Sequence, residues 1–447
     1  MIFVKIITPG ELIYMGNLKL SHFSETLIAS EIVRLGATIK EKILSGEHIY
    51  NYTIGDFDPA QFPIPKALEN EIVQAYHDGF TAYPAAEGEL DLRKAISGFI
   101  EDHLGIHYSP AEILVSAGGR PLIYSAYRTI VDKGDKVIYP VPSWNNNHYV
   151  QFTEGEHVII ESTEENNFMP TAAQIQPHIK GASLLALCSP LNPTGTTFSK
   201  EELEAICDLI IEENDTRKEG EKKLYLMYDQ IYWTLTYGET QHHNPVSLRP
   251  EMKAYTIFID GISKAFASTG VRVGWALGPA EVIIKMRGLN SHVGSWAPMA
   301  EQKAVARYLV QKDKVNEYLA HFKSELEIRL RNIYDGIIKL KQKGFNVDAV
   351  EPQAAIYLTI KIDLVGQSAN GVNLHNQADV TAYLLNEAKI AMVPFHAFGA
   401  GQHSSWYRLS VGVCKTNDIP DILENLEKAL LKLQESKVMD KMQNQLS

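Results

Sequence analysis

The 447-residue sequence predicts an α/β protein with a mostly parallel central sheet covered by helices, joined to a smaller α+β domain. Short apolar runs alternate with amphipathic segments between residues 112 and 280, and longer helical patterns replace this alternation past residue 300. The length also exceeds what one hydrophobic core usually supports. We therefore expect a large domain over residues 60–300 and a small domain built from residues 17–59 and 301–447, preceded by an extension over residues 1–16.

The expected strands of the large domain are apolar over most of their length instead of alternating between apolar and polar residues. This pattern is typical of strands that are buried on both faces of a sheet. The expected strands span residues 112–116, 136–141, 157–161, 183–188, 224–228, 256–260 and 273–277.

The helices between these strands are indicated by their apolar periodicity and by their ends. Residues 120–132 place their apolar side chains on one stripe, and Ser199 with Glu202 predicts a capping box at the start of a helix that ends near residue 212. The nearly all-polar segment 213–223 is expected to be a solvated loop.

The expected small domain combines long helices with a few short strands. Helices are predicted over residues 301–312, 316–343 and 419–433, and strands over 355–362 and 406–411. The polar residues 435–447 are expected to fray.

The N-terminal residues resemble a signal peptide only in part. Lys5 precedes apolar residues, but Pro9 and Glu11 interrupt the apolar run and no small-residue cleavage site follows. The pattern favours Met15 as the start of the protein, with an unstructured extension before it.

The charge and the cysteines exclude several classes of partner. Lys and Arg total 42 against 54 Asp and Glu, and the resulting net charge of −12 is unsuited to nucleic acid or an anionic membrane. No stretch offers the roughly 18 uncharged apolar residues of a membrane span. Because Cys188, Cys207 and Cys414 are far apart and odd in number, we expect no disulfide framework and no metal site, and a reducing, cytoplasmic compartment.

Candidate binding residues follow the expected strands, because ligands of open α/β sheets bind beyond the carboxyl ends of strands. Gly118 and Gly119 precede a helix and allow the backbone to approach an anion, although such a pair is equally an ordinary turn. Asn192 begins an Asn-Pro-Thr-Gly sequence that taken alone is also a turn.

Two further strand ends carry charged side chains. Asp229 closes one apolar run, where a carboxylate needs a cation or hydrogen-bond donors unless it caps a helix. Lys264 closes another, where an amine of lowered pKa serves as a nucleophile unless it reaches solvent. Tyr232 lies three residues after Asp229, and Arg272 lies eight after Lys264.

Taken together, these residues are the contacts that pyridoxal 5′-phosphate requires. A lysine holds its aldehyde as a Schiff base, a carboxylate keeps its pyridine nitrogen protonated, and other groups bind its phosphate and phenolic oxygen. The sequence therefore predicts this cofactor.

From about residue 55 to residue 433 the sequence resembles the class I aminotransferases of PLP-dependent fold type I, especially the bacterial aspartate and aromatic aminotransferase subgroup. The motifs that carry the resemblance occur in the order of that family: SAGGRPL (116–122), PSW (142–144), LNPTG (191–195), YDQIY (228–232), GISKAFASTGVRVGWALGP (261–279) and YRLSVG (407–412). The lysine segment is the most specific of them.

The resemblance implies roles for the residues at the cofactor. Lys264 would form the Schiff base and move the substrate proton, Asp229 would pair with the pyridine nitrogen, and Tyr232 would donate to the phenolic oxygen. The other implied cofactor contacts are Gly118, Gly119, Arg120, Trp144, Asn192, Ser263 and Arg272.

The resemblance also implies a substrate site and a homodimer. Arg408 would bind the α-carboxylate of an amino acid or a 2-oxo acid, aided by Gly55, Asn192 and Trp144. Tyr83 would reach the phosphate in the neighbouring subunit.

The implied activity is transfer of an amino group from an L-amino acid to a 2-oxo acid by a ping-pong mechanism. A PLP-dependent β-elimination lyase or a cyclopropane-carboxylate synthase shares the same residues and is the alternative. A DNA-binding regulator is disfavoured by the acidic charge. Three features depart from the family: Gly261 stands where parts of it carry a serine, Arg120 stands where a threonine or lysine is frequent, and no arginine is identified for a second substrate carboxylate. Arg120 would either add positive charge at the phosphate or point outward.

Overall fold

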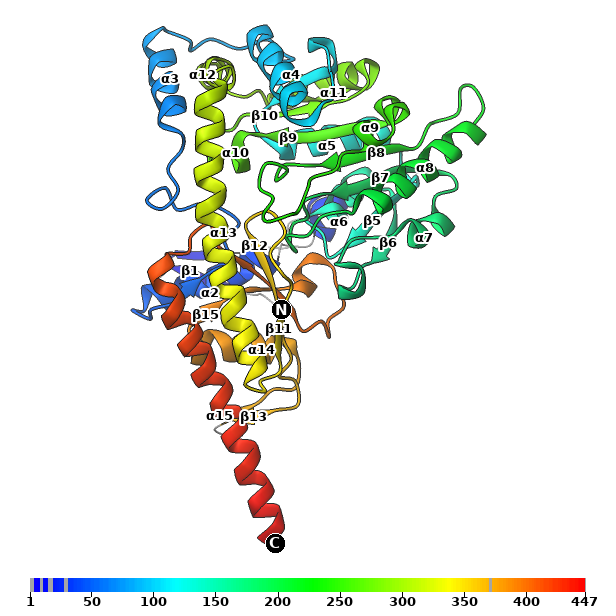
Figure 1. The fold of residues 1–447 in the computed structure, drawn as a ribbon. Helices are drawn as coiled ribbons and strands as arrows, with labels where there is room; N and C mark the ends of the chain where they lie inside the picture. Colours follow the sequence, from blue (N-terminus) through cyan, green and yellow to red (C-terminus); the bar gives the residue numbers. More distant parts are fainter. Residues whose placement is uncertain (1–3, 9–10, 15–18, 28–30, 370–371, 447) are drawn as a thin grey trace.

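The computed structural model describes residues 4–8, 11–14, 19–27, 31–369 and 372–446. Its central sheet has seven strands, in the order β4 (Ile113–Ser116), β10 (Gly274–Leu277), β9 (Thr256–Gly261), β8 (Tyr225–Asp229), β7 (Ala182–Cys188), β5 (Lys136–Val141) and β6 (Glu156–Glu161). Neighbours are parallel except at β10, which runs antiparallel to both β4 and β9. The predicted α/β fold with a mostly parallel sheet is confirmed (Figure 1).

Helices cover both faces of this sheet, so its strands are buried on both sides. Leu184 and Ala186 of β7 join the hydrophobic core on one face, and Leu185 and Leu187 join the core on the other, because successive strand residues point in opposite directions. The first core is completed by α5 (Gly119–Ile130), α6 (Asn146–Thr153) and α11 (Ala280–Val293). The second includes α4 (Leu90–Leu104), α7 (Ala172–Ile175), α8 (Lys200–Thr216) and α12 (Met299–Leu309).

Strand β6 departs from the predicted burial on both faces. It lies at the edge of the sheet, and most of its side chains are exposed or half-buried, including Ile159. An apolar run therefore identified the strand but not its place in the sheet.

Two details of α8 correct the sequence predictions. Ser199 caps the helix by accepting from the Glu202 N–H at 3.2 Å, but the Glu202 carboxylate accepts from the Ala172 N–H, so only half of the expected capping box is present. The helix also runs to Thr216, into the segment expected to be a solvated loop. There Asn214 is fully buried, because its amide bonds both the N–H and the C=O of Leu224.

A second, antiparallel sheet lies beside the first, in the order β11 (Val347–Ala349), β12 (Tyr357–Ile362), β17 (Trp406–Ser410) and β16 (Val393–Pro394). Its core includes side chains of α13 (Lys312–Gln342), α14 (Gln377–Tyr383) and α15 (Ile419–Leu446). Other described elements include the helices α3 (Lys66–His77), α9 (Pro245–Leu248) and α10 (Ile262–Ala265). Two separate strand pairs are β3 (Tyr50–Asn51) with β15 (Ile390–Ala391) and β13 (Ser368–Ala369) with β14 (Val372–Asn373).

Helix α13 connects the two cores along its length (Figure 1). Leu319 packs into the core of the central sheet, whereas Phe322, one turn later, packs into the core of the second sheet. Helix α12 belongs with the first core. We therefore propose that the two domains divide within α13 instead of at residue 300.

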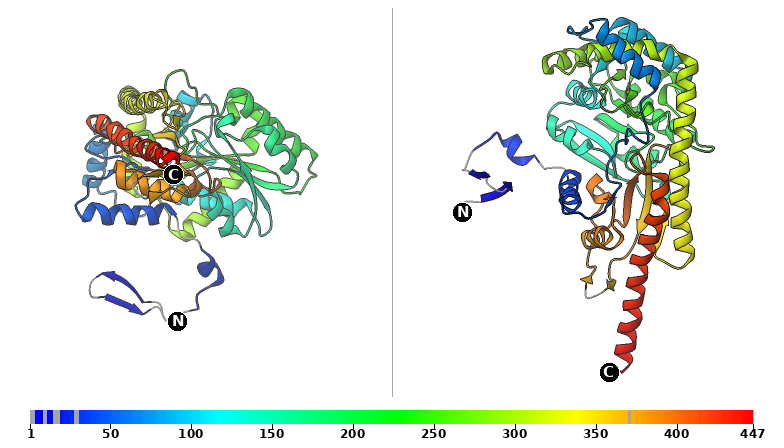
Figure 2. Two further views of the ribbon diagram at one scale, coloured as in Figure 1. Left: turned by 90° about the horizontal axis from the view of Figure 1, so that it is seen from below. Right: turned by 90° about the vertical axis from the view of Figure 1, so that its left-hand side faces the viewer.

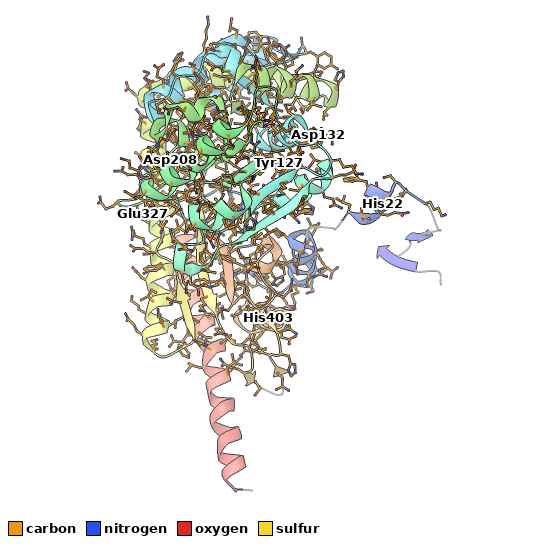
Figure 3. All side chains as sticks on the ribbon, turned by 90° about the vertical axis from the view of Figure 1, so that its right-hand side faces the viewer. His22, Tyr127, Asp132, Asp208, Glu327 and His403 are labelled. Carbon is orange, nitrogen blue, oxygen red and sulfur yellow. The ribbon has the colours of Figure 1, made fainter. Side chains whose placement is uncertain are left out.

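Both ends of the described chain differ from their expected disorder. Strands β1 (Val4–Thr8) and β2 (Glu11–Tyr14) pair in a hairpin that stands apart from the body (Figure 2), and Met15 lies outside the described residues. Helix α1 (His22–Thr26) follows, with His22 exposed on this arm (Figure 3), and then α2 (Glu31–Leu44). At the other end α15 remains helical to Leu446. Within the described residues, we find no helix that is both long and apolar enough to span a membrane.

Candidate active site

Most of the predicted site residues meet where the carboxyl ends of the central strands face the second sheet. Four connections define the place: Lys264 with residue 55, Arg408 with residue 192, Tyr232 with residue 357, and Arg272 with residue 117. The sequence separations of these pairs are all above 100 residues, so only the tertiary fold brings them together.

Lys264 lies in the short helix α10, directly after β9. Its Nζ donates to the carbonyl oxygen of Gly55 at 2.6 Å and lies 5.6 Å from the centre of the Phe57 ring. The pKa of Lys264 is lowered to about 8, mainly by burial and also by the positive charge of Arg408, against the opposing effect of Asp56. A substantial fraction of this amine is therefore neutral, and nucleophilic, near physiological pH.

Asp229 is the last residue of β8, next to the strand that leads to Lys264. Its Oδ1 accepts from the Ile231 N–H at 3.1 Å, and no cationic side chain of the described residues forms an ion pair with it. Burial raises the pKa of Asp229 to about 6. A buried carboxylate without a cation is a place where a protonated ring nitrogen would be stabilised.

Tyr232 follows in the same turn and is buried. Its hydroxyl forms a 2.6 Å hydrogen bond with the hydroxyl of Tyr357, the first residue of β12. Burial raises the pKa of both hydroxyls above the ordinary tyrosine value, so each keeps its proton at neutral pH. The sequence did not indicate Tyr357, because it stands inside an apolar run with no neighbouring motif.

Arg408 lies in the middle of β17 and is almost fully buried. Its Nη1 donates to Oδ1 of Asn192 at 3.0 Å and its Nη2 to the carbonyl oxygen of Thr53 at 2.7 Å. The guanidinium lies over the rings of Tyr357, at 4.6 Å, and Phe398, at 4.9 Å. Its Nε is buried without a partner among the described residues, so the N–H of this atom is available to a ligand.

The glycine turn before α5 lies against Arg272. The guanidinium donates to the carbonyl oxygens of Thr269 and Ala117, each at 2.7 Å. A Cβ on Gly118 would stand 2.3 Å from Nη2 of Arg272, and the φ of Gly118 is +89°, so a side chain is excluded twice at this position. The turn thus places the Arg272 guanidinium near the backbone N–H of Gly119, the first residue of α5. A cation and the N–H groups at the start of a helix together suit a phosphate.

Ser263 and Gly261 are two further residues of the segment that contains Lys264. Ser263 is buried next to Lys264 in α10. A Cβ on Gly261 would lie 2.8 Å from the Cα of Gly274 in the neighbouring strand, so the serine found there in parts of the resembled family would require the backbone to move.

Trp144 and Arg120 form the outer side of the site. The Arg120 guanidinium is exposed and lies 5.5 Å from the centre of the Trp144 ring, and that of Arg408 lies 5.9 Å from the same ring. The guanidinium groups of Arg120 and Arg408 therefore both lie within about 6 Å of the centre of one indole ring. The sequence suggested no such pair, since the two arginines are 288 positions apart.

Tyr83 lies elsewhere on its own chain. It is 86% exposed, and its ring contacts Trp296 at 5.4 Å beside a hollow of about 300 Å³. None of its contacts within the described residues reaches the surroundings of Lys264. A role for Tyr83 in this chain's own site is not supported by its position.

Asp56 is a further site residue that sequence reasoning missed. Its Oδ1 accepts from the Thr269 hydroxyl at 2.6 Å and from the Phe57 N–H at 2.8 Å, and it opposes the lowering of the Lys264 pKa. Its position directly after Gly55, in the segment expected to bind substrate, was the available signal. The described residues contain no group of three or more His, Cys, Asp or Glu side chains arranged to hold a metal ion.

Comparisons with known proteins agree with this arrangement. Residues 47–426 match the family model described as aminotransferase class I and II. The chain is 31% identical over 407 residues to an aspartate aminotransferase of Bacillus sp. (strain YM-2), covering 90% of this chain and 97% of that one.

Solved structures show the same fold. An aspartate aminotransferase from Rhizobium meliloti superposes with a TM-score of 0.83 at 26% identity, covering 93% of this chain and 100% of that one. One from Thermus thermophilus, solved with maleate, superposes with a TM-score of 0.81 at 26% identity, covering 92% and 100%.

Proposed function

Because the chain belongs to the aminotransferase class I and II family and is an aminotransferase, we propose that it binds pyridoxal 5′-phosphate at Lys264 and transfers the amino group of a dicarboxylic L-amino acid to a 2-oxo acid. The observation that carries the proposal is the buried Lys264 amine, whose pKa is lowered by burial and by the charge of Arg408. Lys264 directly follows the strand that neighbours Asp229, whose buried carboxylate forms no ion pair within the described residues.

The residues fit the cofactor at each of its polar groups. Lys264 would hold the aldehyde, Asp229 the pyridine nitrogen, and Tyr232 with Asn192 the phenolic oxygen. Arg272, Ser263 and the Gly118-Gly119 turn would bind the phosphate, and the ring of Trp144 would stack on the cofactor. When bound, the cofactor supplies an electron-accepting ring that makes the Cα proton of an amino acid acidic.

Lys264 has a second role once its amine is free of the cofactor. With a pKa near 8 it can accept a proton at the substrate Cα and donate it again, since efficient proton transfer needs a pKa close to the working pH. Gly55 holds Nζ in a fixed position through the 2.6 Å bond to its carbonyl oxygen. The transfer is ping-pong, because the amino group stays on the enzyme while one acid leaves and another enters.

Arg408 would bind the α-carboxylate. Asn192 and Thr53 hold its two terminal nitrogens, which fixes the plane of the guanidinium, and Nε is free to donate. Burial among aromatic rings strengthens a charge-assisted bond to a carboxylate.

Arg120 would bind the second carboxylate of the substrate. Its guanidinium lies 5.5 Å from the centre of the Trp144 ring, which Arg408 approaches to 5.9 Å, and it is exposed. The relatives named as aspartate aminotransferases, and the one solved with maleate, support a substrate with two carboxylates.

We further propose a homodimer in which Tyr83 reaches the cofactor phosphate of the partner subunit. Tyr83 is 86% exposed beside a hollow that is also lined by Phe80, Trp296 and Met299, and an exposed apolar patch of this kind is suited to contact with a second subunit. Sedimentation of the holoenzyme tests the dimer.

The free Cys188, Cys207 and Cys414 support a reducing, cytoplasmic compartment.

The test of the main proposal uses the cofactor-loaded protein. Borohydride reduction followed by peptide mapping should place the cofactor on Lys264, and a label on another residue would refute the assignment. An oxo acid should form from aspartate or glutamate only when a second oxo acid is present. Pyruvate and ammonia formed without an acceptor would indicate the lyase alternative instead.

A further inference from the structure

Tyr357 lies against several parts of the proposed site, although the proposed reaction assigns it no role. Its hydroxyl lies 2.6 Å from that of Tyr232, and its ring lies under the Arg408 guanidinium at 4.6 Å. A Cβ on Gly55 would stand 2.8 Å from the same hydroxyl, and one on Gly195 would stand 2.4 Å from the Tyr357 carbonyl oxygen. Both glycines thus allow their segments to close on this one tyrosine.

In the proposed site the hydroxyls of Tyr357 and Tyr232 would form a chain of hydrogen bonds that ends at the phenolic oxygen of the cofactor. Tyr232 would donate its proton to the phenolic oxygen of the cofactor, so its own oxygen is left to accept. Tyr357 retains its proton at neutral pH, and its hydroxyl points at that oxygen at hydrogen-bond distance. A tyrosine that accepts a bond is a stronger donor, because consecutive hydrogen bonds polarise one another.

Resting on the proposed function, we infer that Tyr357 is a positioning residue: its hydroxyl donates to Tyr232 and so strengthens the bond that Tyr232 makes to the cofactor's phenolic oxygen, next to the arginine that binds the substrate carboxylate. The residue thereby joins strand β12 of the second sheet to the turn after β8 of the first.

The predicted effect is a change in the pH titration of the cofactor's visible absorption. That absorption changes when the nitrogen joining Lys264 to the cofactor gains or loses its proton. Losing the proton places more negative charge on the phenolic oxygen, so a strong donor there favours the deprotonated form and lowers the midpoint pH. Tyr357→Phe keeps the ring and removes the donor, and should raise the midpoint by about 0.3 to 1 pH unit.

The matched control is Tyr237→Phe. Tyr237 is equally buried and donates to the backbone carbonyl of Ala355, two residues from Tyr357 but outside the site. The same chemical change there should leave the midpoint in place. In a Tyr232→Phe background, Tyr357→Phe should produce no further shift, because the proposed effect passes through the Tyr232 hydroxyl.

The outcomes separate the possible explanations. An unshifted midpoint in Tyr357→Phe, or an equal shift with Tyr232 already changed to Phe, would overturn the inference. So would a loss of maleate affinity in Tyr357→Phe greater than about threefold, since the hydroxyl would then act by holding Arg408. Failure of the proposed function is seen separately, as a wild-type protein that gains no visible absorption with pyridoxal phosphate.

Discussion

The two sheets contribute to the site in different ways. The central sheet supplies Lys264, Asp229 and Asn192 at or just beyond the carboxyl ends of its strands, whereas the second sheet supplies Arg408 and Tyr357 from within strands. In the proposed reaction the first group holds the cofactor and moves protons, and the second binds carboxylate and aligns donors. Strand ends allow varied chemistry on short turns, while a position within a strand fixes a side chain on both sides.

The largest expected effect is on the cofactor side, at Lys264. Lys264→Ala should lower kcat by about 10⁴-fold or more, because it removes both the covalent attachment and the general base. The cofactor-free variant should unfold at the same temperature as wild type or slightly higher, since a buried amine is lost. The surface change Lys341→Ala is the control, and steady-state kinetics with thermal unfolding measures both. Turnover within tenfold of wild type would contradict the assignment.

On the substrate side, Arg408→Lys should lower kcat/KM by about 10² to 10³-fold. Lysine keeps the charge, but its single ammonium nitrogen cannot reproduce the planar fork from which arginine reaches Asn192, Thr53 and the substrate carboxylate with separate nitrogens. The visible absorption of the cofactor-loaded variant should remain, which distinguishes this change from one at Lys264. Arg331→Lys, on the surface of α13, should have no effect. Equal losses in both variants would mean that the measured loss is not specific to the site.

The carboxylate of Asp229, on the cofactor side of the site, is expected to make the stability of the cofactor-free protein depend on pH. Its folded pKa of about 6 lies above the unfolded value, so the folded cofactor-free protein binds the proton more tightly. The stability contributed by this group is present below about pH 4 and is lost as pH rises through 6. Above that pH, Asp229→Asn should be more stable than wild type by roughly 2 to 3 kcal/mol in the cofactor-free state.

Denaturant unfolding of cofactor-free wild type and Asp229→Asn at pH 4.5 and pH 8 measures this difference. Burial raises the pKa of Asp260 to about 8, and the charge of Asp229 also raises it, so Asp229→Asn lowers the Asp260 pKa and thereby widens the gap at pH 8 in the same direction. The two stability profiles should converge at acidic pH. An equal difference in unfolding free energy at pH 4.5 and pH 8 would show that the pKa of the Asp229 carboxylate is not raised in the folded protein.

The sequence predicted the central sheet more completely than the second one. Each central strand was placed within one or two residues, because a strand buried on both faces reads as an apolar run bounded by turns. Strand β16 of the second sheet has only two residues, as do the strands of the separate pairs β3 with β15 and β13 with β14, which is too short for any periodicity. Their pairing depends on tertiary contacts alone.

The site follows the same division. Lys264, Asp229 and Asn192 were predictable because each is a polar residue at the end of an apolar run. Tyr357 was not, because the partner of its hydroxyl lies 125 residues away and leaves no local pattern. The Asn214 amide shows the converse, since a polar residue in a charged segment is buried when backbone groups satisfy it.

The smallest expected effect concerns Arg120, which lies in helix α5 of the large domain but would bind the substrate. Arg120→Gln should raise KM for aspartate and glutamate by about tenfold and leave that for alanine within about twofold, because an exposed charge contributes less than a buried one. The rise should shrink with added salt, which screens exposed charges. Arg128→Gln, farther along α5, is the control. An equal rise for alanine would place Arg120 at the cofactor or the α-carboxylate instead, and the division between the two sheets would then be cleaner than proposed.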